Sequence, residues 1–150
     1  MRIGHDGIEL IKHFEGCRLE AYLCPGNVWT IGYGHTQGVM KGMKISEVRA
    51  EEMLRSDLLR YERAVGKHVI IPLWQCEIDA LVSFVFNVGV RAFKNSTLLK
   101  HLNRGQRHLA AEEFQRWNKA GGVVLEGLVK RRQAEKQLFM RGEPHAYSIA

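Results

Sequence analysis

Apolar residues recur at two different spacings in this 150-residue chain, and the change of spacing limits what the chain can fold into. From about residue 46 onward they recur every three or four positions, the period of an amphipathic helix. Between Arg18 and Ile45 the chain instead carries aromatic and β-branched residues, interrupted by the turn-forming Pro25, Gly26 and Asn27. We therefore predict a small antiparallel sheet in this stretch and a larger, almost wholly helical region after it.

The helix boundaries follow from capping residues and from the apolar pattern. A first helix is predicted to end near Glu15 and Gly16, after a capping-box-like start in which Asp6 is followed three residues later by Glu9. Ser46 is expected to cap a long helix. Later helices are expected to carry Ile78 to Phe86, Leu98 to Leu102 (opened by Ser96), Ala110 to Trp117, and a basic segment from about Leu125 to Arg141.

Together these elements predict an α+β fold in a single domain, residues 1–150. A sheet lobe is expected at about residues 16–45 and a connecting helix at about 46–66. A helical lobe is expected at about 67–150, together with the N-terminal helix. Two lobes of this kind leave a cleft, where ligand sites commonly fall.

The charge of the chain restricts its partners. There are 22 Lys and Arg against 16 Asp and Glu, a formal net charge of +6, and 45% of residues are hydrophobic. The hydrophobic content excludes intrinsic disorder, and the charge favours a polyanion such as nucleic acid, an anionic membrane surface or an acidic polysaccharide. A basic fold with no polyanionic partner fits the same numbers.

The cysteines and the apolar segments indicate the compartment. Cys17, Cys24 and Cys76 are odd in number and fit neither a disulfide framework nor a zinc site, which favours free thiols in a reducing compartment. Cys17 and Cys76 are expected to be buried as small hydrophobes. No segment reaches the roughly 18 apolar residues of a membrane span, and the start lacks the apolar core of a signal peptide. We therefore expect a chain that does not export itself by these routes.

Two charged residues stand out in the predicted helices. Glu15 lies at the C-terminus of the first helix, where the helix dipole disfavours a carboxylate anion and so suits a proton donor. Arg131 shares a helix face with leucines and needs a carboxylate partner if it is buried. Glu15 and Glu135, in the same helix as Arg131, are both candidates for that partner.

The run from Glu15 through Cys24 and Thr30 to GYGHT resembles the catalytic signature of the phage-type lysozymes. These are glycoside hydrolase family 24, also called endolysins or muramidases. In that family a glutamate is followed nine residues later by aspartate or cysteine, and six residues after that by threonine. The similarity spans nearly the whole chain, since four further motifs match in order: FNVG from Phe86, FKNSTLLKHLN from Phe93, FQRW ending at Trp117, and GLVKRR from Gly127.

The resemblance implies hydrolysis of the β-1,4 bond between N-acetylmuramic acid and N-acetylglucosamine in bacterial peptidoglycan. It makes Glu15 the general acid that protonates the glycosidic oxygen, and Thr30 the residue that holds the attacking water. Cys24 stands where many relatives carry aspartate, and we expect it to orient or deprotonate that water as thiolate or thiol, with inversion at the anomeric carbon. His35 is expected to pair with Asp57 in the long helix.

The resemblance also implies substrate contacts by Phe86 and Ser96, with Arg131 in a supporting role. Core packing of Phe86 and helix capping by Ser96 explain these residues equally well. No metal or organic cofactor is implied. The expected protein is a monomer that acts on peptidoglycan, binds no nucleic acid and does not insert stably into a membrane. It is expected to accumulate in the host bacterial cytoplasm and to reach the cell wall after a separate holin opens the membrane.

Two other functions remain open from the sequence. A lytic transglycosylase cleaves the same bond with one catalytic acid and no water. Because position 24 carries a thiol in place of a second carboxylate, this alternative stays open. A non-enzymatic cationic lytic or binding protein would instead use the basic helix from about Leu125 to Arg141.

Overall fold

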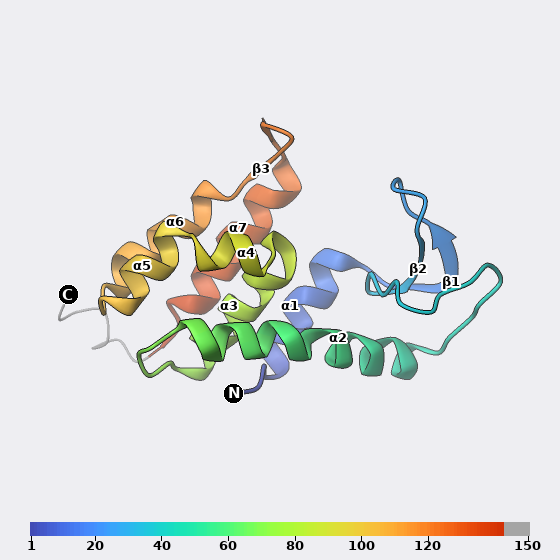
Figure 1. The fold of residues 1–150 in the computed structure, drawn as a ribbon, viewed down its shortest axis with the longest axis horizontal. Coiled ribbons are helices and arrows are strands. Elements are labelled where there is room, and N and C mark those ends of the chain that lie inside the picture. The colour runs from blue at the N-terminus through green and yellow to red at the C-terminus, as the bar shows by residue number, and fades with distance from the viewer. Residues whose placement is uncertain (143–150) are drawn as a thin grey trace. The chain divides into compact units, whose positions relative to one another are not determined.

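The computed structural model describes residues 1–142 and consists of helices with two small antiparallel sheets (Figure 1). The α+β class predicted from the sequence is confirmed. The elements in chain order are α1 (His5–Glu15), β1 (Arg18–Leu23), β2 (Trp29–Gly32), α2 (Glu47–His68), α3 (Gln75–Val88), α4 (Val90–Lys94), α5 (Thr97–Asn103), α6 (Arg107–Glu113), the 3-10 turn η1 (Phe114–Arg116), β3 (Lys119–Ala120), β4 (Val123–Val124) and α7 (Glu126–Phe139).

The chain divides into two compact units. We call Ile11–Arg60 the sheet unit, and Met1–Leu10 with Tyr61–Ala150 the helical unit. Among residues 1–142, no helix is both long enough and apolar enough to cross a bilayer.

The sheet unit is built on the antiparallel pair β1–β2, in which Arg18 faces Gly32 and Leu23 faces Trp29. An irregularity in β1 shifts the register between these ends. Isolated bridges from Glu20 to Lys44 and from Ile31 to His35 extend this two-stranded sheet, which we call the ribbon. Beneath it lies a small apolar core of Ile31, Val39 and Met53, flanked by Ala21, Trp29, Met43 and Ile45.

The helical unit has an aromatic core. Phe84 on α3 meets Phe114 edge-on with ring centroids 5.2 Å apart, and it meets Trp117 in the same way at 5.6 Å. Phe114 also packs on Phe139 of α7 at 5.4 Å. The guanidinium of Arg132 lies 5.1 Å from the centroid of the Phe84 ring, so a cation is part of this core.

The basic helix predicted near the C-terminus is α7, and it is a core element rather than a free amphipathic helix. Arg131, Arg132 and Glu135 are buried, together with Leu138 and Phe139. Two of its cations therefore face the protein interior. A cationic lytic protein acting through this helix is not what the fold provides.

The predicted helix starts are right for α2 and α5 and wrong for α1. Ser46 Oγ accepts from Arg49 N at 3.1 Å, and Ser96 Oγ accepts from Leu99 N at 3.1 Å, so both serines cap their helices. Asp6 instead lies inside the first turn of α1. The acceptor ahead of α1 comes from α3, because Gly4 N donates to the Asp79 carboxylate at 2.7 Å.

One element was missed altogether. β3 and β4 form a hairpin around Gly121 and Gly122, whose φ angles of 57° and 79° are those of a tight two-residue turn. The double glycine, which lies between two of the predicted helices, is the turn of this hairpin.

Candidate active site

The three predicted catalytic residues all lie in the sheet unit. Glu15 ends α1 and is half-buried, Cys24 follows β1 and is half-buried, and Thr30 lies on β2 with 4% of its surface exposed. The antiparallel pairing of β1 with β2 therefore brings two segments of the signature side by side. Side chains along a strand point alternately to opposite faces. The register of the pairing therefore fixes which face of the β1–β2 sheet carries Thr30.

Glu15 is placed by the glycine-rich turn that follows β2. Ile31 and His35 exchange both backbone hydrogen bonds at 2.9 Å, which closes a tight turn over residues 32–34. Gly34 has φ of 89°, a conformation that L-residues avoid. A Cβ added to Gly34 would lie 3.8 Å from Glu15 Oε1, so the carboxyl group packs directly over this turn.

The same turn is fastened to α2 by His35. Its Nδ1 lies 2.8 Å from Asp57 Oδ2 and 3.0 Å from Oδ1, and its Nε2 lies 2.9 Å from Gln37 O. The pairing of His35 with Asp57 expected from the resemblance is present. Both ring nitrogens face acceptors, which fixes the ring and with it the turn beside Glu15.

Cys24 opens the turn between the two strands. Its backbone N–H donates to Val28 O at 3.0 Å, and its carbonyl accepts from Asn27 N at 2.9 Å. Backbone N–H groups of Val28 and Gly26, together with the Thr30 side chain, lower the pKa of the Cys24 thiol, although partial burial opposes them. The thiolate is therefore more abundant at neutral pH than in an ordinary cysteine.

Thr30 contacts both the turn and the thiol. Its hydroxyl donates to Val28 O at 2.9 Å, and its interaction with Cys24 stabilises the thiolate. A hydroxyl has one proton and two lone pairs. When the Thr30 hydroxyl donates its proton to Val28 O or to Cys24, its lone pairs can accept a hydrogen bond from a water molecule.

We expect this difference in pKa to appear in thiol reactivity. Burial raises the pKa of the Cys76 thiol, whereas hydrogen bonds lower that of Cys24. Iodoacetamide at pH 7 should thus alkylate Cys24 faster than Cys76, and the Cys24 rate should level off at the lower pH, because only the thiolate reacts. Peptide mass spectrometry over time and pH measures both rates, with the exposed Cys17 as an internal reference. Equal rates at Cys24 and Cys76 would contradict this assignment.

The remaining predicted site residues lie in the helical unit. Phe86 is half-buried and meets Tyr61 edge-on, with ring centroids 5.2 Å apart. Ser96 is 3% exposed, and its hydroxyl donates to Phe93 O at 2.7 Å in addition to capping α5. Phe86 thus retains some free surface, while the hydroxyl of Ser96 already serves its own helix.

Arg131 Nε lies 3.3 Å from Oε2 of Glu135, one of its two candidate partners. It also donates to Ser83 O at 3.3 Å, and Ser83 Oγ donates to Glu135 at 2.6 Å. Arg132 Nε lies 3.3 Å from the other oxygen of Glu135. Burial raises the pKa of the Glu135 carboxyl, and the guanidinium groups of Arg132 and Arg131 oppose that rise.

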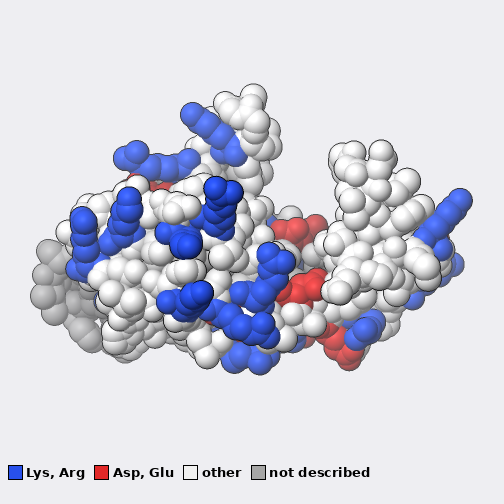
Figure 2. Space-filling view, viewed as in Figure 1, with Lys and Arg blue, Asp and Glu red and all other residues white. Residues whose placement is uncertain are grey.

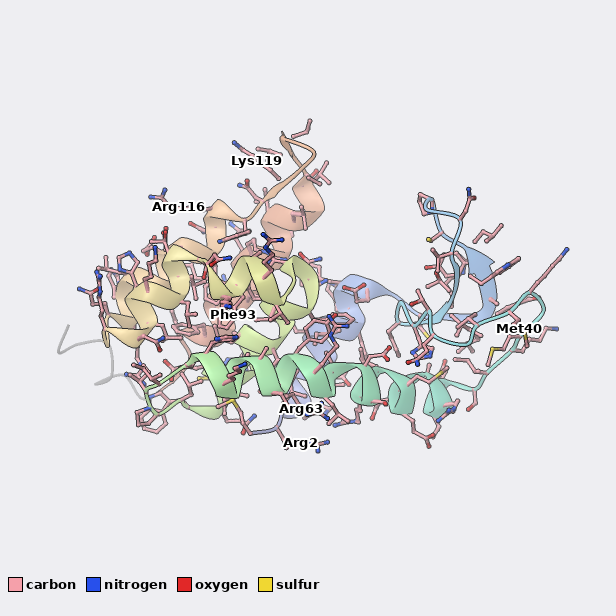
Figure 3. The ribbon with its side chains drawn as sticks, in the orientation of Figure 1. Arg2, Met40, Arg63, Phe93, Arg116 and Lys119 are labelled. Atoms are coloured by element: carbon pink, nitrogen blue, oxygen red, sulfur yellow. The ribbon has the colours of Figure 1, made fainter. Side chains whose placement is uncertain are left out.

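An open cavity of about 450 Å³ adjoins this cluster, and the sequence analysis did not anticipate it. Its polar lining includes Asn87, whose Oδ1 accepts from Arg132, and Lys119, which projects from the hairpin (Figure 3). Asn87 belongs to the FNVG motif and Trp117 ends the FQRW motif. Membership in these motifs is the sequence feature that could have identified the two residues as lining a site. The other lining residues are Val88, Ala120, Leu125 and Leu128.

No group of three or more His, Cys, Asp or Glu side chains suited to a metal ion occurs within residues 1–142. The three predicted catalytic side chains are a carboxyl group, a thiol and a hydroxyl. Such groups support acid–base catalysis around a bound water.

Comparison with known proteins places this site in context. The protein-family model described as phage lysozyme matches residues 12–135. The endolysin of Bacillus phage B103 is 48% identical over 95% of this chain, which spans only 56% of that relative. The endolysin of Acyrthosiphon pisum secondary endosymbiont phage 1 is 46% identical, over 93% of this chain and 98% of that one. The solved muramidase domain of SpmX from Asticaccaulis excentricus superposes with a TM-score of 0.88 at 42% identity, covering 93% of this chain and 97% of the domain.

Proposed function

The chain belongs to the phage lysozyme family, and from that premise we propose that it is an endolysin of glycoside hydrolase family 24 that degrades bacterial peptidoglycan. The bond cleaved is the β-1,4 bond between N-acetylmuramic acid and N-acetylglucosamine. The observation that supports the proposal is that Glu15, Cys24 and Thr30 stand in the family's order and spacing, with Cys24 and Thr30 at the β1–β2 pair.

In this proposal Glu15 protonates the glycosidic oxygen. The leaving sugar is a poor leaving group as an alkoxide, so bond breaking needs a proton from a positioned acid. The glycine turn supports this role, because Gly34 lets the carboxyl group lie against the backbone. The hydrogen bond of His35 with Asp57 holds the turn in place.

Cys24 and Thr30 are proposed to prepare the attacking water. The Thr30 hydroxyl accepts a hydrogen bond from the water, and the Cys24 thiolate, stabilised by the N–H of Val28, orients it or takes its proton. Attack from the side opposite Glu15 gives inversion, in which the water stands between the sugar and the base.

The polysaccharide is proposed to contact Phe86 through its exposed part. The cavity beside Asn87 and Trp117 offers an amide and an aromatic ring for further contact. Arg131 acts indirectly, by holding α7 against α3 through Glu135 and Ser83. Ser96 remains a proposed contact whose hydroxyl would first have to leave Phe93 O.

We further propose that the protein acts as a monomer without a metal or organic cofactor. It would accumulate in the host bacterial cytoplasm and reach the cell wall once a separate holin opens the membrane. Peptidoglycan is then the only macromolecule it needs to recognise for catalysis.

The test is digestion of purified cell walls in water enriched in heavy oxygen, followed by mass spectrometry of the muropeptides. Hydrolysis is expected to place one heavy oxygen at each new N-acetylmuramic acid reducing end. A lytic transglycosylase would leave 1,6-anhydro ends without heavy oxygen, because the sugar's own hydroxyl replaces water. Products of the second kind would overturn the hydrolytic assignment of Cys24 and Thr30.

A further inference from the structure

The loop between α2 and α3 exposes apolar side chains at a place that catalysis does not use. Ile70 is 77% exposed and Trp74 is 40% exposed. Single exposed apolar residues are common on protein surfaces, so exposure alone indicates little. The residues around this loop decide whether the exposure of Ile70 indicates a binding surface.

The loop is held in place by polar side chains from its neighbours. Asn103 at the end of α5 donates through Nδ2 to His68 O at 2.9 Å, and its Oδ1 accepts from Ile70 N at 2.9 Å. Arg107 on α6 donates to Pro72 O. The side chain of Ile70 is thus presented to solvent by a backbone that is fixed on both sides.

Three cations lie close in sequence to the residues that hold this loop. Lys67 directly precedes His68, Arg104 directly follows Asn103, and Lys100 lies one helical turn before Arg104. All three side chains are exposed. Among the residues that the structure describes, none of the three has a carboxylate within ion-pair distance. We call Lys67, Ile70, Lys100 and Arg104 the Ile70 patch.

Cations at helix C-termini also stabilise their own helices, and Lys67 and Lys100 are in the last turns of α2 and α5. That effect does not explain the charge balance of the whole unit. Residues 1–10 and 61–142 contain fifteen Lys and Arg against nine Asp and Glu, whereas residues 11–60 contain seven against six.

The carboxylates of the helical unit are also largely hidden. Five of the nine are buried: Glu62, Glu77, Asp79, Glu113 and Glu135. Figure 2 shows the consequence, since Lys and Arg side chains are spread over the face that carries α2, α4 and α5, with few Asp or Glu among them. Arg63 projects from α2 on this face, one helical turn before Lys67 (Figure 3).

From these observations we propose that the Ile70 patch docks the protein on the surface of an anionic lipid bilayer. The cations alone would suit any phosphate polymer, soluble or not. A fixed, exposed isoleucine among them favours lipid, because the boundary between headgroups and acyl chains takes up an apolar side chain. The contact is peripheral and reversible, and it depends on salt.

The test is co-sedimentation of the full chain with vesicles of phosphatidylglycerol and phosphatidylethanolamine. Binding is expected at low ionic strength, with loss in about 0.5 M salt, where exposed charges are screened, and no binding to phosphatidylcholine vesicles. Arg104→Glu should weaken binding about fivefold or more, from roughly 1 kcal/mol per surface cation. Ile70→Ser should weaken it roughly threefold, because it removes the inserted apolar group.

Matched controls come from the sheet unit. Val48 is 71% exposed on α2 and Lys41 is exposed in the loop before it, so Val48→Ser and Lys41→Glu repeat the same chemical changes outside the patch. Both controls should keep wild-type binding. The proposal is overturned if the wild type ignores phosphatidylglycerol, or if the controls weaken binding as much as the patch variants.

A soluble glycerol phosphate polymer separates lipid from other sources of phosphate. If Arg104→Glu loses both ligands while Ile70→Ser leaves vesicle binding unchanged, the patch binds phosphate chains and the lipid proposal fails. Cell-wall hydrolysis is measured in parallel, and both patch variants should keep it, because neither residue lies in the proposed active site. Glu15→Gln should bind vesicles normally, so failure of docking and failure of the proposed function are distinguishable.

Discussion

Replacing Glu15 by glutamine is expected to lower the rate of cell-wall solubilisation by roughly 10²- to 10⁴-fold, the usual contribution of a positioned general acid. The amide keeps the size of the side chain but has no acidic proton. Its packing over Gly34 should persist, since the contact requires only the end of the side chain. Loss of turbidity of purified walls measures the rate, and thermal unfolding shows whether the fold is intact.

The matched control is Glu20→Gln. Glu20 lies on β1, is exposed, and takes part in the fold through a backbone bridge to Lys44 that an amide side chain leaves intact. We expect this variant to keep wild-type activity. If Glu15→Gln still solubilises walls at a rate close to wild type, the acid is another residue and the proposed mechanism falls.

Cys24→Ser is expected to cost roughly hundredfold in activity, whereas Cys24→Asp should recover much of it. A serine hydroxyl does not ionise at neutral pH, so the N–H groups of Val28 and Gly26 would have no anion to stabilise. An aspartate restores a negative charge at the same position. Initial rates on purified walls across pH compare the three proteins.

Cys17→Ser and Cys76→Ser control for the loss of a thiol elsewhere. Cys17 is exposed, so its predicted burial is wrong, and Cys76 is half-buried with its thiol against Phe139 O. Both variants should remain active. Full activity in Cys24→Ser would show that the thiol only fills space, and would leave Thr30 and the backbone to position the water.

The sequence predicted the large elements of the fold well because they depend on local periodicity. α2 spans Glu47–His68 against the expected 46–66, and α7 spans Glu126–Phe139 against about 125–141. Ser46 and Ser96 were recognisable as caps because a cap lies within three residues of the group it serves.

The failures involve partners that are distant in sequence or an element too short to show a pattern. Asp79 serves the start of α1 from α3, so no local pattern near Asp6 could reveal it. The hairpin β3–β4 has only two residues in each strand, too few for an alternating pattern. Arg132 of α7 lies on Phe84 of α3 with none of its surface exposed, a contact that no local pattern reveals.

For the candidate site, motif spacing identified Glu15, Cys24 and Thr30 but not how they interact. The stabilisation of the Cys24 thiolate depends on a turn that returns Val28 to position 24, and strand pairing places Thr30 beside it. The cavity beside Asn87 depends on α3, α7 and the hairpin together. Such features follow from tertiary packing, which the spacing of residues does not encode.

The burial of Arg131 and Arg132 has a practical consequence for protein engineering. A programme that lowers the isoelectric point of this chain, for instance to reduce adsorption to glass or resin, should leave these two arginines untouched. Neutralising either would remove one of the two cations that pair with the buried carboxylate of Glu135, at an expected cost of about 3–5 kcal/mol.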